Sequence, residues 1–408
     1  MMQLTTLANG LRVASREMPG FATAAVGLYA DSGSRSEPAA LSGIAHLFEH
    51  MVFKGAGGRS ARELSEAIED VGGELNACTE RDGTSFTASV MPEHVPLAVA
   101  LIADLILRPH LAEQDLAREK DVVLQELGEA EDTPNDIIFD DLWSAAFEGQ
   151  AIGRSILGDE ASISRISRAD LDAWRLSQFR GQNLILVGAG KLDHEALVAL
   201  AQTHFAELEP GAAPPPEPAR FTGGSRLGRS PSEQAHLTIA FPAPHARAPD
   251  YFAARLFADV VGGGTSSRLF QALREERGLA YSIYSTLHAF ADIGLFYTYA
   301  ATAKRQSAEA ARLIEEVIAA AAADVTQREL DRARTQARAA LLMSLETPWG
   351  QASYVARILS VHGHLVEPSE VIAQYQAVTL DQLRAAGAAM VAGARACATI
   401  GVPAVRAA

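Results

Sequence analysis

A proline- and glycine-rich stretch at the midpoint of the chain constrains its fold more than any other feature. Residues Glu209 to Pro218 read Glu-Pro-Gly-Ala-Ala-Pro-Pro-Pro-Glu-Pro. Proline lacks the backbone N–H that a helix interior or a central strand requires, and consecutive prolines form a stiff extended segment. We therefore predict a linker at 209–218 between an N-terminal domain, residues 1–208, and a C-terminal domain, residues 219–408.

The two halves repeat one order of predicted elements, namely strand, helix, two strands, long helices and a closing strand. In the first half these are strands 11–17 and 23–30, helix 43–54, strands 74–79 and 84–90, helices 95–107 and 112–131, and strand 184–188. In the second half they are strand 235–241, helices 251–261 and 265–277, strands 280–285 and 294–300, helices 307–322 and 327–345, and strand 396–402. This repetition predicts an α+β fold of two homologous domains, each a mostly antiparallel sheet packed with helices.

Charge and composition exclude several functions. A formal net charge of −15 argues against nucleic-acid binding, which depends on clustered lysine and arginine, although acidic surfaces can attract basic peptides. The sequence opens without a basic region followed by an apolar one and contains no stretch of about 18 apolar residues, so we expect neither export nor membrane association. Cys78 and Cys397 fall in different predicted domains, which fits a reduced, cytoplasmic compartment. The glycine run at 262–264 is not followed by the lysine of a phosphate-binding loop, so nucleotide binding is not expected.

The strongest chemical signal is the pentapeptide His46-Leu47-Phe48-Glu49-His50. A helix places residues three and four apart on one face, so the side chains of His46, Glu49 and His50 can converge. Two neutral imidazoles at this spacing suit a tetrahedral zinc ion, which takes a third protein ligand and leaves one position to water. Glu49 would be close enough to accept a proton from that water. The order of residues is the inverse of the commoner H-E-x-x-H motif.

The spacing of the later glutamates does not select the third ligand. Glu119 and Glu126 lie seven residues apart in the predicted helix 112–131, so they share a face, and Glu129 also shares it. One of them could bind the metal while another orients a ligand. The segment of the second half that corresponds to the motif, residues 252–262, contains neither histidine nor glutamate, so only the first half is equipped for metal chemistry.

Two alternatives to a metallopeptidase site remain open from the motif. The two histidines could be ordinary helix residues, with Glu49 paired to a lysine such as Lys54. The motif would also permit a zinc hydrolase that acts on substrates other than peptides.

Four stretches together are much more specific than the pentapeptide. They are SGIAHLFEHMVFKG, GGELNACTERDGTSF, EKDVVLQEL and GGGTSSRLFQALREERGLAYSIYS. On these stretches the chain resembles the pitrilysin and insulinase family of metallopeptidases, in particular the branch of the mitochondrial processing peptidase and its bacterial relatives. The resemblance covers nearly the whole chain.

The resemblance implies roles for particular residues. The third zinc ligand of the family falls on Glu126, 76 residues after His50, and a supporting glutamate falls on Glu119. An arginine and a tyrosine spaced R-x6-Y, which the family places opposite the metal, fall on Arg274 and Tyr281.

The resemblance also implies a mode of substrate binding. Asn76 and Ala77 fall on the edge-strand segment where an extended substrate pairs backbone to backbone.

The family's working particle encloses a chamber made of four such domains. For this chain the resemblance implies a homodimer, or a heterodimer with a related subunit, that cleaves oligopeptides or unfolded segments. The competing expectation is a non-catalytic core or partner subunit of the same fold, although such relatives usually lose the motif.

Overall fold

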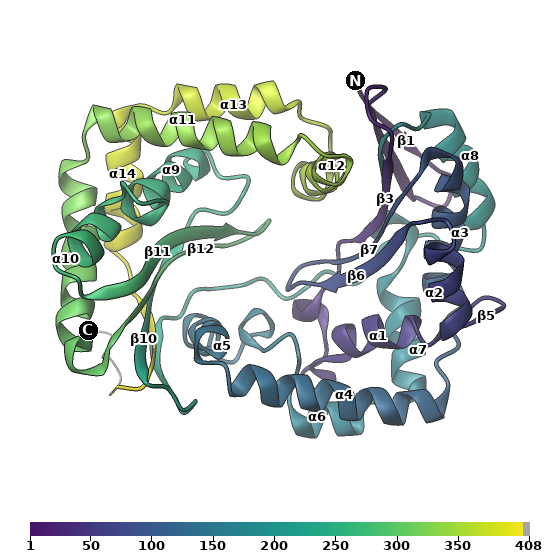
Figure 1. The fold of residues 1–408 in the computed structure, drawn as a ribbon, viewed down its shortest axis with the longest axis horizontal. Coiled ribbons are helices and arrows are strands. Elements are labelled where there is room, and N and C mark those ends of the chain that lie inside the picture. Colours follow the sequence, from purple (N-terminus) through teal and green to yellow (C-terminus); the bar gives the residue numbers. More distant parts are fainter. Residues whose placement is uncertain (403–408) are drawn as a thin grey trace. The chain divides into compact units, whose positions relative to one another are not determined.

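The computed structural model describes residues 1–402, which form two compact units (Figure 1). The first unit comprises residues 1–127, 155–217 and 342–367, and the second comprises residues 128–154, 218–341 and the chain from residue 368. The units are therefore interleaved along the chain and are not contiguous halves. Helix α5 (Pro134–Ala146) of the first half belongs to the second unit, and helix α12 (Pro348–His362) of the second half belongs to the first.

The first unit is built on a six-stranded sheet with the order β1-β2-β8-β3-β7-β6. Its strands are β1 (Met2–Thr6), β2 (Arg12–Glu17), β3 (Ala24–Ala30), β6 (Glu74–Thr79), β7 (Thr84–Val90) and β8 (Leu184–Gly190). Strands β2 and β8 run parallel, and all other neighbours are antiparallel. Strand β6 lies at one edge and pairs only with β7.

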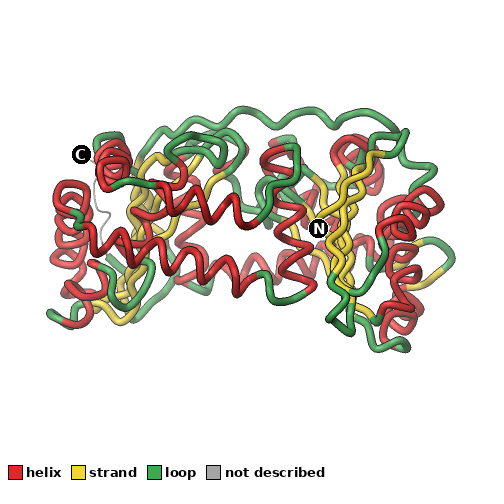
Figure 2. The backbone as a smooth tube through the Cα atoms, turned by 90° about the horizontal axis from the view of Figure 1, so that it is seen from above, coloured by secondary structure: helices red, strands yellow, loops and turns green. Residues whose placement is uncertain are grey.

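Helices cover both faces of this sheet, as Figure 2 lets the reader follow. Successive side chains of a strand point to opposite faces, so Leu184 and Leu186 of β8 enter one core with α3 (Val95–Leu107) and α8 (His194–His204). Ile185 and Val187 enter the other core, which α12 closes with Val355 and Leu359 among others. Strand β8 is buried along its whole length, as expected of a strand with apolar residues on both faces.

The second unit repeats this plan. Its five strands have the order β11-β12-β10-β13-β9, and they are β9 (Gly224–Gly228), β10 (Gln234–Ala243), β11 (Ala280–Ala289), β12 (Gly294–Ala303) and β13 (Ala396–Ile400). The single parallel pair, β13 with β9, occupies the place of β8 with β2 in the first sheet, and β11 takes the edge position of β6. The predicted α+β fold of two homologous, mostly antiparallel sheets packed with helices is confirmed.

In this unit α5 takes the part that α12 plays in the first. Its buried residues Ile138, Leu142 and Trp143 pack against alternate residues of β10, β12 and β13. The opposite face is covered by α9 (Tyr251–Gly262), α10 (Ser307–Asp324) and α14 (Leu380–Val391). Each sheet is thus closed on one face by a helix that the chain supplies from its other half.

The remaining elements connect these layers. The helices are α1 (Ile44–Val52), α2 (Ala61–Glu69), α4 (Glu113–Glu131), α6 (Glu160–Arg165), α7 (Arg168–Gln178), α11 (Gln327–Ser344) and α13 (Pro368–Ala377), and a short hairpin is formed by β4 (Gly55–Ala56) and β5 (Arg59–Ser60). Within residues 1–402 no helix has the length and apolar character needed to cross a bilayer.

The proline-rich segment is bound to the first unit along most of its length. The backbone N–H groups of Gly181 and Gln182 donate to the carbonyl oxygens of Glu209 and Gly211, both at 3.0 Å. Further along, the guanidinium of Arg35 donates to the carbonyl oxygen of Glu217 at 3.1 Å. The segment is therefore an extended strap on the first unit, and the change of unit occurs at Pro218.

Helix α1, which carries the histidine motif, is capped from a distance. Its N-cap residue is Gly43, whose φ of 89° lies in the left-handed region, and glycine offers no side chain to cap the helix. The buried carboxylate of Glu37 replaces that cap, because its two oxygens accept from the backbone N–H groups of Gly43 at 2.8 Å and Ala45 at 2.9 Å. An anion at this end also interacts favourably with the helix dipole.

The packing of α5 on the second sheet predicts a local effect of Leu142→Ala. Removing this fully buried side chain should lower the free energy of unfolding by about 2–5 kcal/mol. Hydrogen exchange measured by mass spectrometry should speed up in β10 and β13 and stay unchanged in β3 and β8. Asn135→Ala, on the exposed side of α5, is the control. Faster exchange in the first sheet instead would contradict this assignment of α5.

The cap predicts that Glu37→Gln destabilises α1. An amide keeps one acceptor oxygen but turns an N–H toward a backbone N–H, so the variant should lose about 1–3 kcal/mol of stability. Urea unfolding measures that loss, and hydrogen exchange of the Gly43 and Ala45 amides localises it. Glu69→Gln, an exposed glutamate of α2, should change neither.

Candidate metal centre

Helices α1 and α4 bring three metal-binding side chains together within the first unit. The Nε2 atoms of His46 and His50 lie 3.8 Å and 3.5 Å from Oε2 of Glu126. The two imidazole rings are 4.6 Å apart between centroids. One ligand atom from each of the three residues lies within 4.8 Å of the other two. Among residues 1–402, His46, His50 and Glu126 are the group of histidine, cysteine and acidic residues whose ligand atoms lie this close together.

The donor set fits a tetrahedral zinc ion. With ligand bonds of about 2.0–2.2 Å, zinc holds its ligand atoms roughly 3.3–3.5 Å from one another, close to the two separations observed. These separations exceed the 2.7–3.2 Å typical of an N–H···O hydrogen bond, so direct hydrogen bonds do not account for the arrangement. Burial, and secondarily the neighbouring His50, lowers the pKa of His46 to about 4. His46 is therefore neutral at pH 7 and can offer a lone pair.

Glu119 lies on the same face of α4 as Glu126 and contacts the second histidine, His50. Its Oε2 lies 3.2 Å from Nδ1 of His50, which leaves Nε2 of that ring toward Glu126. Its Oε1 lies 2.8 Å from Nζ of Lys54. The side chain of Glu119 is 8% exposed, so these two contacts account for both oxygens of a buried carboxylate.

Glu129 lies outside this group. It is exposed on α4, and its carbonyl oxygen accepts from the hydroxyl of Thr133 at 2.7 Å.

Glu49 shares the polar face of α1 with the histidines and meets the end of strand β6. Its Oε2 accepts from the hydroxyl of Thr79 at 2.6 Å. Burial raises the pKa of Glu49, while the hydrogen bonds from Thr79 act in the opposite direction. Lys54 contacts Glu119, so the structure does not contain the Glu49–Lys54 pair considered as an alternative from the sequence.

Sequence reasoning did not single out Thr79. This residue ends the exposed edge strand and is itself buried, so its hydroxyl faces the motif helix and fixes the Glu49 carboxylate. The available signal would have been a polar residue at the end of a strand, and Thr79 lies inside the second of the four stretches quoted above.

Asn76 and Ala77 lie on β6, the edge strand of the first sheet. The backbone N–H of Ala77 donates to Oδ1 of the exposed Asn76 at 2.9 Å. An added strand that used this N–H would displace the Asn76 side chain. Strand β6 ends at Thr79, whose hydroxyl donates to Glu49.

Arg274 and Tyr281 lie beside each other in the second unit. The guanidinium carbon of Arg274 is 5.6 Å from the centre of the Tyr281 ring and 4.9 Å from that of Phe270. The segment Phe270–Glu275 is a π-helix, although an α-helix was predicted over 265–277. Tyr281 is the extra residue of a β-bulge in β11, which re-aims its side chain, and it is 76% exposed. The structure thus pairs these two residues with each other, whereas the ligand set belongs to the first unit.

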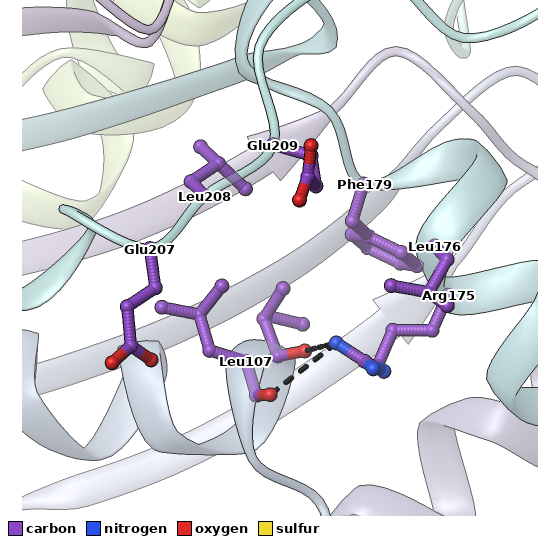
Figure 3. Close-up of a pocket in the computed structure, with 8 residues that line it drawn as sticks. Leu107, Arg175, Leu176, Phe179, Glu207, Leu208 and Glu209 are labelled. Carbon is purple, nitrogen blue, oxygen red and sulfur yellow. Dashed lines mark hydrogen bonds between the residues drawn. The ribbon is translucent and has the colours of Figure 1, made fainter.

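A cavity of about 120 Å³ elsewhere in the first unit shares no residue with the metal centre (Figure 3). It is lined by Ile106, Leu107, Arg175, Leu176, Phe179, Glu207, Leu208 and Glu209. Arg175 donates to the carbonyl oxygens of Ile106 and Leu107 at the end of α3 and pairs with Asp172 at 2.7 Å. Its guanidinium is committed to holding helices together, so this cavity offers no unpaired cationic group to a substrate.

The sequence matches two family models. Residues 12–160 match the model described as insulinase (peptidase family M16), and residues 165–337 match the model described as peptidase M16 inactive domain. The first match contains the motif helix together with Glu119 and Glu126 of α4. The second covers the part of the chain in which no metal motif was predicted.

Curated relatives align over nearly the whole chain. An uncharacterized zinc protease of Mycobacterium tuberculosis is 35% identical over 390 residues, which cover 93% of this chain and 89% of that protein. The beta subunit of the mitochondrial-processing peptidase of Lentinula edodes is 32% identical, with coverage of 94% and 86%.

Solved structures share the fold. A structure titled peptidase M16 inactive domain from Pseudomonas fluorescens superposes with a TM-score of 0.91 at 22% identity and covers 100% of this chain and 99% of that one. A protease from Helicobacter pylori superposes with a TM-score of 0.89 at 21% identity, covering 98% and 99%. With the relatives above, these findings confirm the resemblance drawn from the four sequence stretches: the chain belongs to the insulinase family of peptidases, family M16.

Proposed function

We propose that this protein is a zinc-dependent endopeptidase in which His46, His50 and Glu126 hold the metal and Glu49 is the general base. The observation that carries the proposal is the convergence of the three ligand atoms within 4.8 Å beside the half-buried carboxylate of Glu49. Membership of a family whose relatives are named zinc proteases supports zinc as the ion. The N, N, O donor set, with a position left for water, is that of catalytic zinc sites.

When bound, zinc would act as a Lewis acid that polarises the scissile carbonyl and acidifies a water molecule. Glu49 would accept the proton of that water and later deliver it to the leaving amine. Thr79 holds the Glu49 carboxylate in place by its hydrogen bond, and the raised pKa of Glu49 suits a group that must both take up and return a proton.

The proposed substrates are oligopeptides or unfolded segments bound as an added strand on β6. An edge strand offers backbone donors and acceptors that are independent of the side chains of the peptide, so affinity would come with limited sequence demand. The position of Asn76 and Ala77 on this edge, in the strand that ends at Thr79, supports this mode of binding.

The proposed assembly is a homodimer, or a heterodimer with a related subunit, that encloses a chamber. Under this proposal Arg274 and Tyr281 of each chain face the metal of the partner. The Tyr281 hydroxyl would donate to the oxyanion that forms at the scissile carbonyl, and Arg274 would bind a substrate carbonyl or carboxylate. The exposure of the Tyr281 side chain supports a role outside the core of its own unit.

Glu49→Gln should retain zinc but abolish cleavage, because the amide keeps the shape of the side chain and cannot accept the proton. The measurement is cleavage of a mixed pool of peptides by purified protein, read by mass spectrometry and paired with the zinc content of each variant. Treatment of the native protein with a chelator should stop cleavage, and added zinc should restore it. Equal cleavage by the native protein and the Glu49→Gln variant would rule out Glu49 as the base. No cleavage by the native protein would favour a missing partner subunit or a non-catalytic subunit.

A mixing experiment tests the proposed homodimer. Glu49→Gln and Tyr281→Phe should each be strongly impaired alone, whereas co-refolded mixtures should regain part of the native activity, because a mixed dimer contains one site with both native residues. Light scattering reports the mass of each preparation. A monomeric mass at the concentration of the assay, or the absence of any recovery, would contradict the arrangement.

A further inference from the structure

We propose that Lys54 is a positioning residue for the metal ligand His50, acting through Glu119. This inference rests on the proposed zinc site and extends it by one residue. Lys54 itself reaches neither the three ligand atoms nor Glu49 by any contact described above. It would therefore act on the metal only through the carboxylate that it shares with His50.

The position of Lys54 is fixed by the helix that carries the motif. It follows the end of α1 by two residues, and its backbone N–H donates to the carbonyl oxygen of Met51 at 3.1 Å. Its side chain then reaches across to α4, where Nζ lies 2.8 Å from Oε1 of Glu119. The ion pair thus links the C-terminal end of α1 to the helix that supplies Glu126.

Glu119 divides its two oxygens between two partners. Oε1 contacts Lys54, and Oε2 contacts Nδ1 of His50. A carboxylate restrained at one oxygen cannot rotate freely, so Lys54 determines where the other oxygen meets the imidazole. That contact in turn directs Nε2 of His50 toward Glu126. Outer partners of this kind orient metal-binding histidines and fix the ring nitrogen that binds.

Burial makes the ion pair necessary. The side chain of Glu119 is 8% exposed, whereas that of Lys54 is 35% exposed. Loss of Lys54 would leave Oε1 of this buried carboxylate without its cationic partner, which is costly, so Glu119 would reorient or recruit water. Three carboxylates, those of Glu49, Glu119 and Glu126, lie near the two imidazoles. The charge of Lys54 together with a divalent ion would balance them.

The neighbouring Lys120 provides a matched control. It follows Glu119 directly in α4, but its Nζ donates to the carbonyl oxygen of Ser164 at 2.8 Å. Removing Lys120 therefore deletes the same charge close to the site without touching the Glu119 carboxylate.

The test is the zinc affinity of the purified full chain, measured by competition with a chromophoric chelator, so that no catalytic assay is involved. Lys54→Met should weaken zinc binding by about tenfold or more, within the range known for outer-sphere partners of metal ligands. Lys54→Arg should recover most of that loss because it restores a cation beside Oε1. Lys120→Met should bind zinc as the native protein does. Thermal unfolding of each metal-free variant checks that the fold is retained.

A double-mutant cycle asks whether the effect passes through Glu119. In a Glu119→Gln background, Lys54→Met should produce little further loss, because the carboxylate through which it acts is gone. Equal losses for Lys54→Met in both backgrounds, or equal losses for Lys54→Met and Lys120→Met, would overturn the inference. The inference would also be overturned if the native protein binds zinc and the Lys54→Met variant binds it with the same affinity. Failure of the native protein to bind zinc would instead refute the proposed metal site itself.

Discussion

The burial of helix α1 is the constraint on which the rest of the structure depends. Its side chains Ile44, Ala45, Leu47, Phe48, Met51 and Val52 are all buried, so the helix has one remaining face for polar groups. His46, Glu49 and His50 occupy that face. Packing at one side of a nine-residue helix therefore determines the direction of the three reactive groups at the other, and the Glu37 cap fixes where the helix begins. The candidate metal centre therefore depends on core packing as much as on its own residues.

Duplication gave the two units the same sheet but different uses of its edge. In the first unit, edge strand β6 ends at Thr79 beside Glu49, and in the second, edge strand β11 begins with a bulge that turns Tyr281 outward. The second unit has no metal motif on its corresponding helix α9, where apolar side chains fill the core instead. The first unit carries the histidine motif on α1, and the second carries Arg274 beside the exposed Tyr281.

Much of this architecture follows from the sequence. Strands 74–79 and 84–90 and helix 95–107 were predicted with the bounds observed, because their alternating or helical periodicity is strong and turn residues limit them. Family resemblance singled out Glu126 among glutamates that spacing left equivalent. Periodicity shows that a helix has an apolar face but not which sheet will receive it, so the exchange of α5 and α12 was not predicted. Lys54 and Thr79 were not assigned to the site either, since their roles depend on contacts between segments far apart in sequence.

The exchange of α5 and α12 has a consequence for the order in which the chain can fold. Strand β8 completes the first sheet near the middle of the chain, yet the helix that covers its second face is made close to the end. During synthesis the apolar residues of that face, such as Ile185 and Val187, stay uncovered while most of the second half is translated. A nascent first half therefore exposes an apolar face, which favours aggregation until α12 is made. Neither half of the chain would form a complete unit if it were expressed alone. The helix that covers one face of each sheet is encoded in the other half.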